Sequence, residues 1–284
     1  MIDVFSPLPP EARRETIAAY SKFLADRDGV LDVERRTLSH REEKMARHSK
    51  PLARVRDMDR ALFDAQYTSF DAKRATPPEM LLLLTLLKAN AAEAFGVNTT
   101  IEKVFREALA KQDNLELTLL VEEHYHTRIL LSSAVLYGIE VTSPYKPAAA
   151  FRALIHGIAI SPKFMARPLT LAAEILGTLV FLNMLYKCRE VLADDPELRD
   201  AVEERICEVL IDELGHVTYN RMCLGAAGLA QAKFLLPIVA SAISRAVPEA
   251  VALDAARIYT ALDVRALAEG SRLPDHVRRS AFIS

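Results

Sequence analysis

The feature that most constrains this chain is a repeated Glu-x-x-His, at Glu123-x-x-His126 and at Glu213-x-x-His216. On a helix, residues three apart lie on the same face, so the Glu and His of each pair can reach one metal ion. A single glutamate in an apolar segment precedes each pair, Glu93 before the first and Glu174 before the second. Two such pairs and two single glutamates form the ligand set of a dinuclear carboxylate site in a helical bundle. The sequence therefore predicts a fold organised around two metal ions.

The spacing of these residues places them at matching heights on neighbouring helices. Thirty residues separate Glu93 from Glu123, and 39 separate Glu174 from Glu213. Because a helix rises about 1.5 Å per residue, each interval suits a chain that leaves the metal level, turns and comes back. The 48 residues from His126 to Glu174 are enough for one long crossover. We therefore expect two antiparallel helical hairpins joined by that crossover.

Helical geometry also selects among the residues around the two pairs. At about 100° per residue, His126 lies roughly 60° from Glu123 around the helix axis, whereas His124 points away from His126. We expect His126 to face the metal and His124 to lie at the surface or outside the ligand layer. Glu122 and Asp212 directly precede the two paired glutamates. Metal-bound imidazoles usually donate their other N–H to a carboxylate or carbonyl, so we expect these two acids to hold the histidines.

Each motif taken alone has a simpler explanation. Acidic residues are common on helices, so a single Glu-x-x-His carries little information. Two of them, each preceded by a glutamate in an apolar run, are harder to obtain by chance. An unpaired carboxylate buried in the apolar run around Glu174 would cost several kcal/mol, and a metal ion removes that cost. Glu93 is the weakest member, because its alanine-rich surroundings also suit a position facing solvent.

The chain is expected to form one all-α domain. Within residues 77–226, the expected core, caps and apolar periodicity predict helices over 77–111, 113–138, 169–191 and 197–224, with a crossover that contains a short helix near 151–155. Gly96 and a capping box at Thr99-x-x-Glu102 leave open whether 77–111 is one bent helix or two. Residues 1–76 form accessory N-terminal helices. Residues 227–284 form two more helices, near 229–246 and 248–269, and a polar tail.

A basic run in the N-terminal part is expected to be a solvated helix face, with anion binding as the alternative. The run covers residues 38–50 and includes Arg41, Lys44, Arg47, His48 and Lys50.

The composition restricts the partners and the cellular location that we expect for this protein. The net charge of −2 gives no electrostatic case for nucleic acid or an anionic membrane. Cys188, Cys207 and Cys223 are scattered and form no disulfide framework, which favours a reducing cytoplasmic location. The start has no signal-peptide pattern, and Glu174 and Asn183 interrupt the longest apolar stretch, so we expect no membrane span.

Over residues 77–226 the chain resembles the ferritin-like di-iron carboxylate superfamily. Asp212-Glu213-Leu214-Gly215-His216 is also similar to the Asp-Glu-x-Arg-His motif of bacterial multicomponent monooxygenases, with Gly215 in place of the Arg. In size and flanking helices the chain is most similar to stand-alone arylamine N-oxygenases. Those enzymes carry a third histidine where this chain has Val209, a departure that counts against N-oxygenation. Asp212-x-x-x-His216 also occurs in haem-oxygenase-like di-iron oxidases, but the tandem Glu-x-x-His disfavours that architecture.

The resemblance implies a ferritin-like four-helix bundle with flanking N- and C-terminal helices and an O2-activating oxygenase. It implies two iron ions, with manganese as an alternative, and oxidation of a small organic substrate by N-oxygenation or C–H hydroxylation. No dinucleotide or Cys-cluster motif is present, so electrons would come from an external donor. The resemblance assigns the following metal ligands: Glu93, Glu123, His126, Glu174, Glu213 and His216. Apolar walls are expected from Leu119, Leu130, Ile206 and Val209.

Three other functions stay open at this point. An iron-storage or detoxification bundle would use the same ligands, although the flanking helices are more than a minimal storage shell needs. A tRNA-modifying di-iron hydroxylase is supported only by the basic residues over Arg41–Arg56. A purely structural bundle would make both motifs coincidental. A homodimer is compatible with all of these functions.

Overall fold

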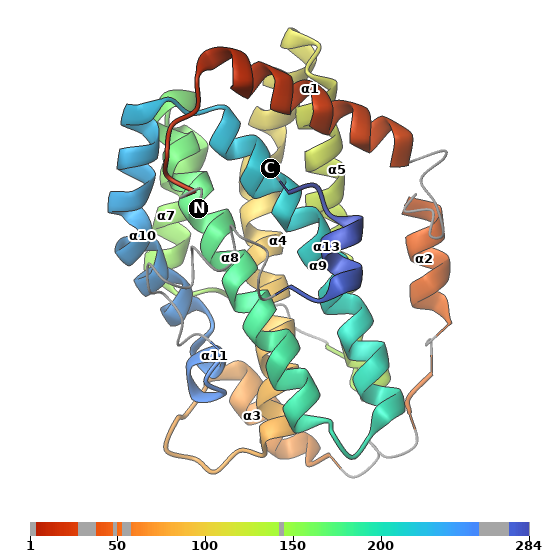
Figure 1. The fold of residues 1–284 in the computed structure, drawn as a ribbon. Helices are drawn as coiled ribbons and strands as arrows, with labels where there is room; N and C mark the ends of the chain where they lie inside the picture. Colours follow the sequence, from red (N-terminus) through yellow and green to blue (C-terminus); the bar gives the residue numbers. More distant parts are fainter. Residues whose placement is uncertain are drawn as a thin grey trace.

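Every regular element in the described part of the chain is a helix, which confirms the predicted all-α class (Figure 1). The computed structural model describes residues 4–27, 38–47, 50–52, 58–141, 145–255 and 273–283. Four long helices carry the predicted ligands: α4 (Pro78–Lys111), α5 (Asn114–Ile129), α8 (Lys163–Val191) and α9 (Pro196–Met222). α4 packs chiefly against α5, and α8 against α9, so the two predicted hairpins are present.

The predicted starts of α5 and α9 are confirmed by their caps. The Asp113 carboxylate accepts a hydrogen bond from the Glu116 N–H at 3.0 Å, and the Asp195 carboxylate accepts one from the Leu198 N–H at 3.3 Å. Both caps satisfy backbone donors that the first helical turn leaves without partners.

Helix α4 is a single helix that passes through Gly96, which resolves the open question about residues 77–111. The Thr99 hydroxyl donates to the Phe95 carbonyl at 2.7 Å, and the Thr100 hydroxyl to the Gly96 carbonyl at 2.9 Å. These hydroxyls are thus satisfied inside the helix, and the predicted capping box at Thr99 is wrong. A Cβ on Gly96 would lie 3.8 Å from Ile155, so nothing there requires a glycine or a break.

Two other boundaries differ from the prediction. α5 ends at Ile129, and a separate short helix, α6 (Ser133–Leu136), follows before Gly138 turns the chain with a φ of 60°. α8 begins six residues before the predicted position and contains Pro168, which lacks the N–H that would close a helical hydrogen bond. The proline therefore marked neither the start of this helix nor its end.

The other helices surround the four that carry the predicted ligands (Figure 1). α7 (Ala149–Ile160), which includes the predicted short helix of the crossover, packs against α4 and α10 (Ala226–Ala246), and α10 packs along α8. α1 (Pro10–Arg27) and α13 (Asp275–Ser280) pack on α9. The remaining flanking helices are α2 (Leu38–Ala46), α3 (Arg60–Thr68) and α11 (Pro248–Ala252). Most of the predicted helix over 248–269 lies outside the described residues.

Three helices, α4, α8 and α10, are long and apolar enough to cross a membrane by length and composition alone. In α4 and α8 most of the apolar window is buried inside the protein (61% and 67%), whereas only 28% of the α10 window is buried. The sequence-based expectations of a cytoplasmic protein without a membrane span therefore stay predictions.

A buried ion pair joins α4 to α11 at the end of the molecule where α3 also packs. Lys88 donates to the Glu249 carboxylate and, at 3.1 Å, to the Gln66 carbonyl. Its ammonium also lies 4.5 Å from the centre of the Tyr145 ring. Both charged side chains are essentially inaccessible to solvent, so neither charge can be hydrated if the other is removed.

We expect Lys88→Met to lower the free energy of unfolding by about 3–5 kcal/mol, because it leaves the Glu249 carboxylate buried without its cation. Urea denaturation measures this loss. Lys22→Met is the matched control: Lys22 pairs with Asp26 at the surface, and its loss should cost less than about 1 kcal/mol. Equal effects of the two substitutions would contradict the assignment of a tightly coupled buried pair.

Candidate metal centre

The structure brings all six predicted ligands together between the four long helices. They form two groups that could each hold a metal ion, with ligand atoms within 4.8 Å of one another. One group comprises Glu93, Glu123, His126 and Glu213, and the other comprises Glu123, Glu174, Glu213 and His216. Glu123 and Glu213 belong to both groups, which is the arrangement expected when two carboxylates lie between two neighbouring ions.

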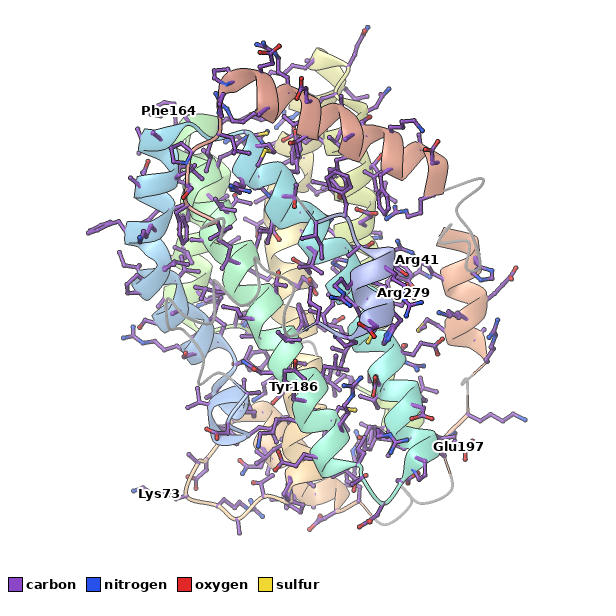
Figure 2. All side chains as sticks on the ribbon, in the orientation of Figure 1. Arg41, Lys73, Phe164, Tyr186, Glu197 and Arg279 are labelled. Atoms are coloured by element: carbon purple, nitrogen blue, oxygen red, sulfur yellow. The ribbon has the colours of Figure 1, made fainter. Side chains whose placement is uncertain are left out.

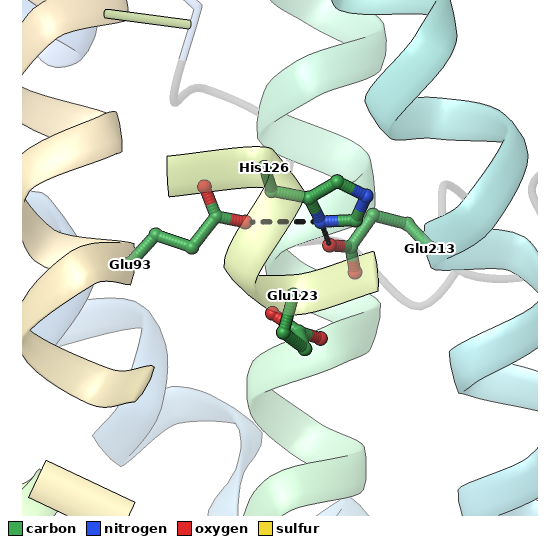
Figure 3. Close-up of side chains that lie close together, drawn as sticks. All are labelled: Glu93, Glu123, His126 and Glu213. Atoms are coloured by element: carbon green, nitrogen blue, oxygen red, sulfur yellow. Dashed lines mark ion pairs between the residues drawn. The ribbon is translucent and has the colours of Figure 1, made fainter. Parts of the chain in front are cut away.

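The two histidines direct the same ring nitrogen into the cluster. His126 Nδ1 lies 3.5 Å from Glu93 Oε1 and 3.3 Å from Glu213 Oε1 (Figure 3). His216 Nδ1 lies 2.8 Å from Glu123 Oε1. His124, by contrast, is exposed, as the helical geometry predicted.

Three inward atoms of the cluster are buried without a hydrogen-bond partner among the described residues: Glu93 Oε2, His126 Nδ1 and His216 Nδ1. Buried polar atoms in native proteins nearly always have a hydrogen-bond partner, so we infer that a bound ligand contacts these three atoms. Carboxylate oxygens and imidazole nitrogens together suit iron, manganese or zinc. The residues present therefore fit a pair of divalent ions, and the cluster itself does not specify which metal.

The charges of the cluster require cations or protons. Burial raises the pKa of Glu93 to about 7, and burial together with the nearby Glu213 and Glu123 raises the pKa of Glu174 well above its usual range. Burial opposes charge on the histidines, but the nearby carboxylates of Asp212, Glu213 and Glu93 raise the pKa of His126. The charge of Glu123 does the same for His216. Two divalent ions would balance the four carboxylates of the cluster without these protons.

The stability of the metal-free protein is expected to fall as the pH rises from about 6 to about 8. Glu93, Glu174, His126 and His216 all have a higher pKa in the folded protein than in the unfolded chain. Their stabilising protons are fully present at low pH and are lost as the pH passes through the folded pKa. Thermal unfolding of chelator-treated protein at both pH values tests this. Zinc-loaded protein is the control, because ligands deprotonate to bind metal and its stability should not fall in this way. A metal-free protein that gains stability over this range would contradict the assignment.

Glu122 and Asp212 lie where the sequence predicted, behind the histidines. Asp212 Oδ2 lies 3.1 Å from Nε2 of His126, and Glu122 Oε2 lies 3.0 Å from Nε2 of His216. An ionised carboxylate only accepts, so each histidine donates its Nε2–H and keeps Nδ1 free for the cluster. The pairing crosses between helices, because α9 holds the histidine of α5 and α5 holds the histidine of α9. This exchange fixes the orientation of both rings and ties the two hairpins together.

Two arginines form, together with Glu122 and Asp212, an outer layer of charges behind the histidines, and neither contact was predicted from the sequence. Arg27 donates to Glu122 and, at 3.3 Å, to Asp212. Arg41, which is labelled in Figure 2, donates to both oxygens of Asp212. Both arginines are buried, so the two carboxylates behind the histidines are matched by two guanidinium groups.

The prediction that the basic run is a solvated face is therefore wrong for Arg41, which is 1% exposed. Lys44, one turn later on α2, also turns towards α9 and lies 3.3 Å from Glu204. Arg47 is exposed, as predicted. His48 and residue 49 lie outside the described residues. The only signal in the sequence was a charge-balance argument, since two buried acids behind the histidines require cations.

Gly215 is a further position whose role the sequence did not reveal. A Cβ there would overlap the hydroxyl and ring of Tyr20, so the Tyr20 side chain can occupy this place against α9 only because position 215 is a glycine. The similar monooxygenase motif has an arginine at this position. In this chain Tyr20 occupies the space, and the nearby guanidinium groups come from α1 and α2.

A cavity of about 350 Å³ adjoins the cluster between α4, α5, α7, α8, α9 and α10. Most of its wall is aliphatic or aromatic, and five of the six predicted ligands line it: Glu93, Glu123, Glu174, Glu213 and His216. Of the four predicted wall residues, Leu119 lines the cavity. Leu130, Ile206 and Val209 instead belong to the packed core, because the faces that carry them point away from the cavity.

Searches with protein-family models, against curated proteins and against solved structures find no match to this chain.

Proposed function

We propose that this chain is an O2-activating non-haem di-iron oxygenase, built on a ferritin-like four-helix bundle, that oxidises a small organic substrate by N-oxygenation or C–H hydroxylation. The observation that carries the proposal is that the apolar cavity opens on the ligand cluster. Structural metal sites are closed by protein on all sides, whereas catalytic sites keep a position open. An open, carboxylate-rich cluster facing a mostly apolar cavity favours chemistry on a bound organic molecule.

The residues of the chain have distinct roles in this proposal. Glu93, Glu123, His126, Glu174, Glu213 and His216 would hold the two metal ions. Iron bound there would supply the reaction with O2, and manganese is an alternative occupant of one or both positions. Asp212 and Glu122 hold the histidines in the tautomer that presents Nδ1. The apolar walls exclude water from the substrate side.

The remaining expectations belong to the same proposal. Electrons come from an external donor such as a ferredoxin and its reductase, and the protein works in the cytoplasm, alone or as a homodimer. Nucleic-acid substrates are disfavoured, because Arg41, in the run that suggested them, points into the protein. A storage role is disfavoured because the space beside the cluster is mostly apolar and offers few sites for mineral growth.

Anaerobic loading with Fe(II) followed by exposure to O2 tests the proposal. We expect two iron ions per chain, oxygen uptake that continues beyond their own oxidation when reductant is supplied, and a transient visible absorbance. Zinc-loaded protein is the matched control and should take up no oxygen. Accumulation of many irons per chain would support storage instead. Two bound ions without any reaction with O2 would overturn the oxygenase.

A further inference from the structure

The cavity extends far beyond the metal ligands and has the form of a channel. Its lining on α4 runs from Ala89 to Glu107, and its lining on α8 runs from Lys163 to Phe181. Each of these stretches covers about 27 Å of helix. α4 and α8 are antiparallel here, since Lys103 of α4 donates to the Ser161 carbonyl just before α8 begins. A volume of about 350 Å³ distributed over such a length makes a narrow bore.

One end of the channel carries charges with a net excess of cations. The charged lining residues at this end are Lys103, Glu107, Glu116, Lys163 and Arg167. Lys163 lies 2.5 Å from Glu116 and 3.6 Å from Glu107, and Arg167 lies 3.1 Å from Glu116. Three cations thus face two acids, and Nη1 of Arg167 is buried without a hydrogen-bond partner among the described residues. This end can accept one further anionic group.

The other end of the channel is apolar. Beyond the ligand cluster, the lining consists of residues such as Ala89, Val180, Phe181, Ala246 and Val247. None of the lining residues at this end carries a charge, so a hydrocarbon chain can fill it without desolvating an ion.

The ligand cluster lies between the two ends. Arg167 precedes Glu174 by seven residues on α8, and Glu116 precedes Glu123 by seven residues on α5. Seven residues are about two helical turns, so Arg167 and Glu116 lie on the same helix faces as these ligands and about 10 Å from them. Phe181 follows Glu174 by seven residues, so about 10 Å of channel continues past the cluster. A molecule that fills the channel therefore passes the cluster with its middle.

We propose that the channel binds a long-chain aliphatic carboxylate, with its anionic head at Arg167 and Lys163 and its tail beyond the cluster. An extended chain advances about 1.2 Å per bond, so the atom beside the cluster lies roughly eight to nine bonds from the head. Ile160 and Phe164 are 84% and 74% exposed and lie within three residues of Lys163 in the sequence, so they suit the arrival of an amphiphile at the charged end.

The site of oxidation follows from this placement and rests on the proposed function. An internal C–H bond would become C–OH, with O2, two electrons from the external donor and two protons giving the alcohol and one water. Binding of the aliphatic carboxylate requires no metal, so the two proposals can be tested separately.

Calorimetric titration of metal-free protein with dodecanoate, 1-dodecanol and dodecylamine tests the charged end. We expect one dodecanoate per chain, bound at least about tenfold more tightly than the amine, because a charge-assisted hydrogen bond contributes this much. Arg167→Met should weaken dodecanoate about tenfold and leave dodecanol unchanged. Equal affinity for the acid and the amine, or no binding of the acid, would overturn the proposal.

Gly177 provides a test of the apolar end. It lines the channel one turn past Glu174, and a Cβ there would meet nothing within 4 Å. We expect Gly177→Leu to reduce dodecanoate affinity at least about tenfold while octanoate, which ends near the cluster, still binds. Gly157→Leu is the matched control, since Gly157 also has open space around it but does not line the channel. Identical behaviour of the two variants would overturn the proposed tail position.

Iron-loaded protein with reductant and O2 then separates the two proposals. Oxidation of dodecanoate at an internal carbon supports both. Binding as described without oxidation leaves the channel assignment intact and counts against the oxygenase. Sustained oxidation of other substrates by O2, without binding of dodecanoate, overturns the channel assignment alone.

Discussion

Glu213→Ala is expected to reduce the metal content from two ions per chain to none at the same free metal concentration, because Glu213 belongs to both ligand groups. Glu93→Ala and Glu174→Ala should each remove a single ion, since each belongs to one group. Elemental analysis after loading with zinc and gel filtration measures these contents without any redox chemistry.

The histidines provide a matched pair for the same measurement. His126→Ala should lose the ion of its group, whereas His124→Ala, two residues away on the exposed face of α5, should keep both ions. Metal content that is unchanged in Glu213→Ala, or lowered equally by the two histidine substitutions, would contradict the assignment of ligands.

The second large effect is expected at Arg41. Arg41→Met leaves the buried Asp212 carboxylate without the guanidinium that contacts both of its oxygens. Breaking a buried ion pair in this way costs about 3–5 kcal/mol, so we expect a loss of that size in the free energy of unfolding. Because Asp212 also holds His126, metal affinity should fall by about 10–100-fold.

Arg47→Met is the control for Arg41→Met, because Arg47 belongs to the same basic run and is exposed. It should change stability by less than about 1 kcal/mol and leave metal affinity unchanged. Urea denaturation and competition with a zinc chelator measure the two quantities. If Arg41→Met behaves like Arg47→Met, the outer layer of charges does not support the site as described.

Local rules in the sequence were sufficient to predict the four ligand-bearing helices and the six residues that meet between them. The caps at Asp113 and Asp195 fixed two helix starts, and helical periodicity separated His126 from His124. The same local rules failed at Thr99, because a threonine hydroxyl can be satisfied by a carbonyl one turn back as well as by a cap. The observed helix boundaries therefore differ from the predicted ones, whereas the six ligands lie at the predicted positions on their helices.

Contacts between distant segments could not be predicted from the sequence. Arg41 meets Asp212 across 171 residues of chain, and a basic run looks the same whether it faces water or a buried acid. Lys88 and Glu249 are 161 residues apart and form a similar buried pair. The charged end of the channel likewise combines side chains of α4, α5 and α8 that share no sequence motif. These features depend on tertiary packing, which only the structure reveals.

The most direct test of the metal centre is a crystal structure of iron-loaded protein with anomalous scattering measured at the iron edge. We expect two peaks: one between Glu93 and His126, the other between Glu174 and His216, with Glu123 and Glu213 close to both. We also expect Nδ1, not Nε2, of each histidine to face its ion. No peak between these helices, or a single peak held by other residues, would contradict the dinuclear centre.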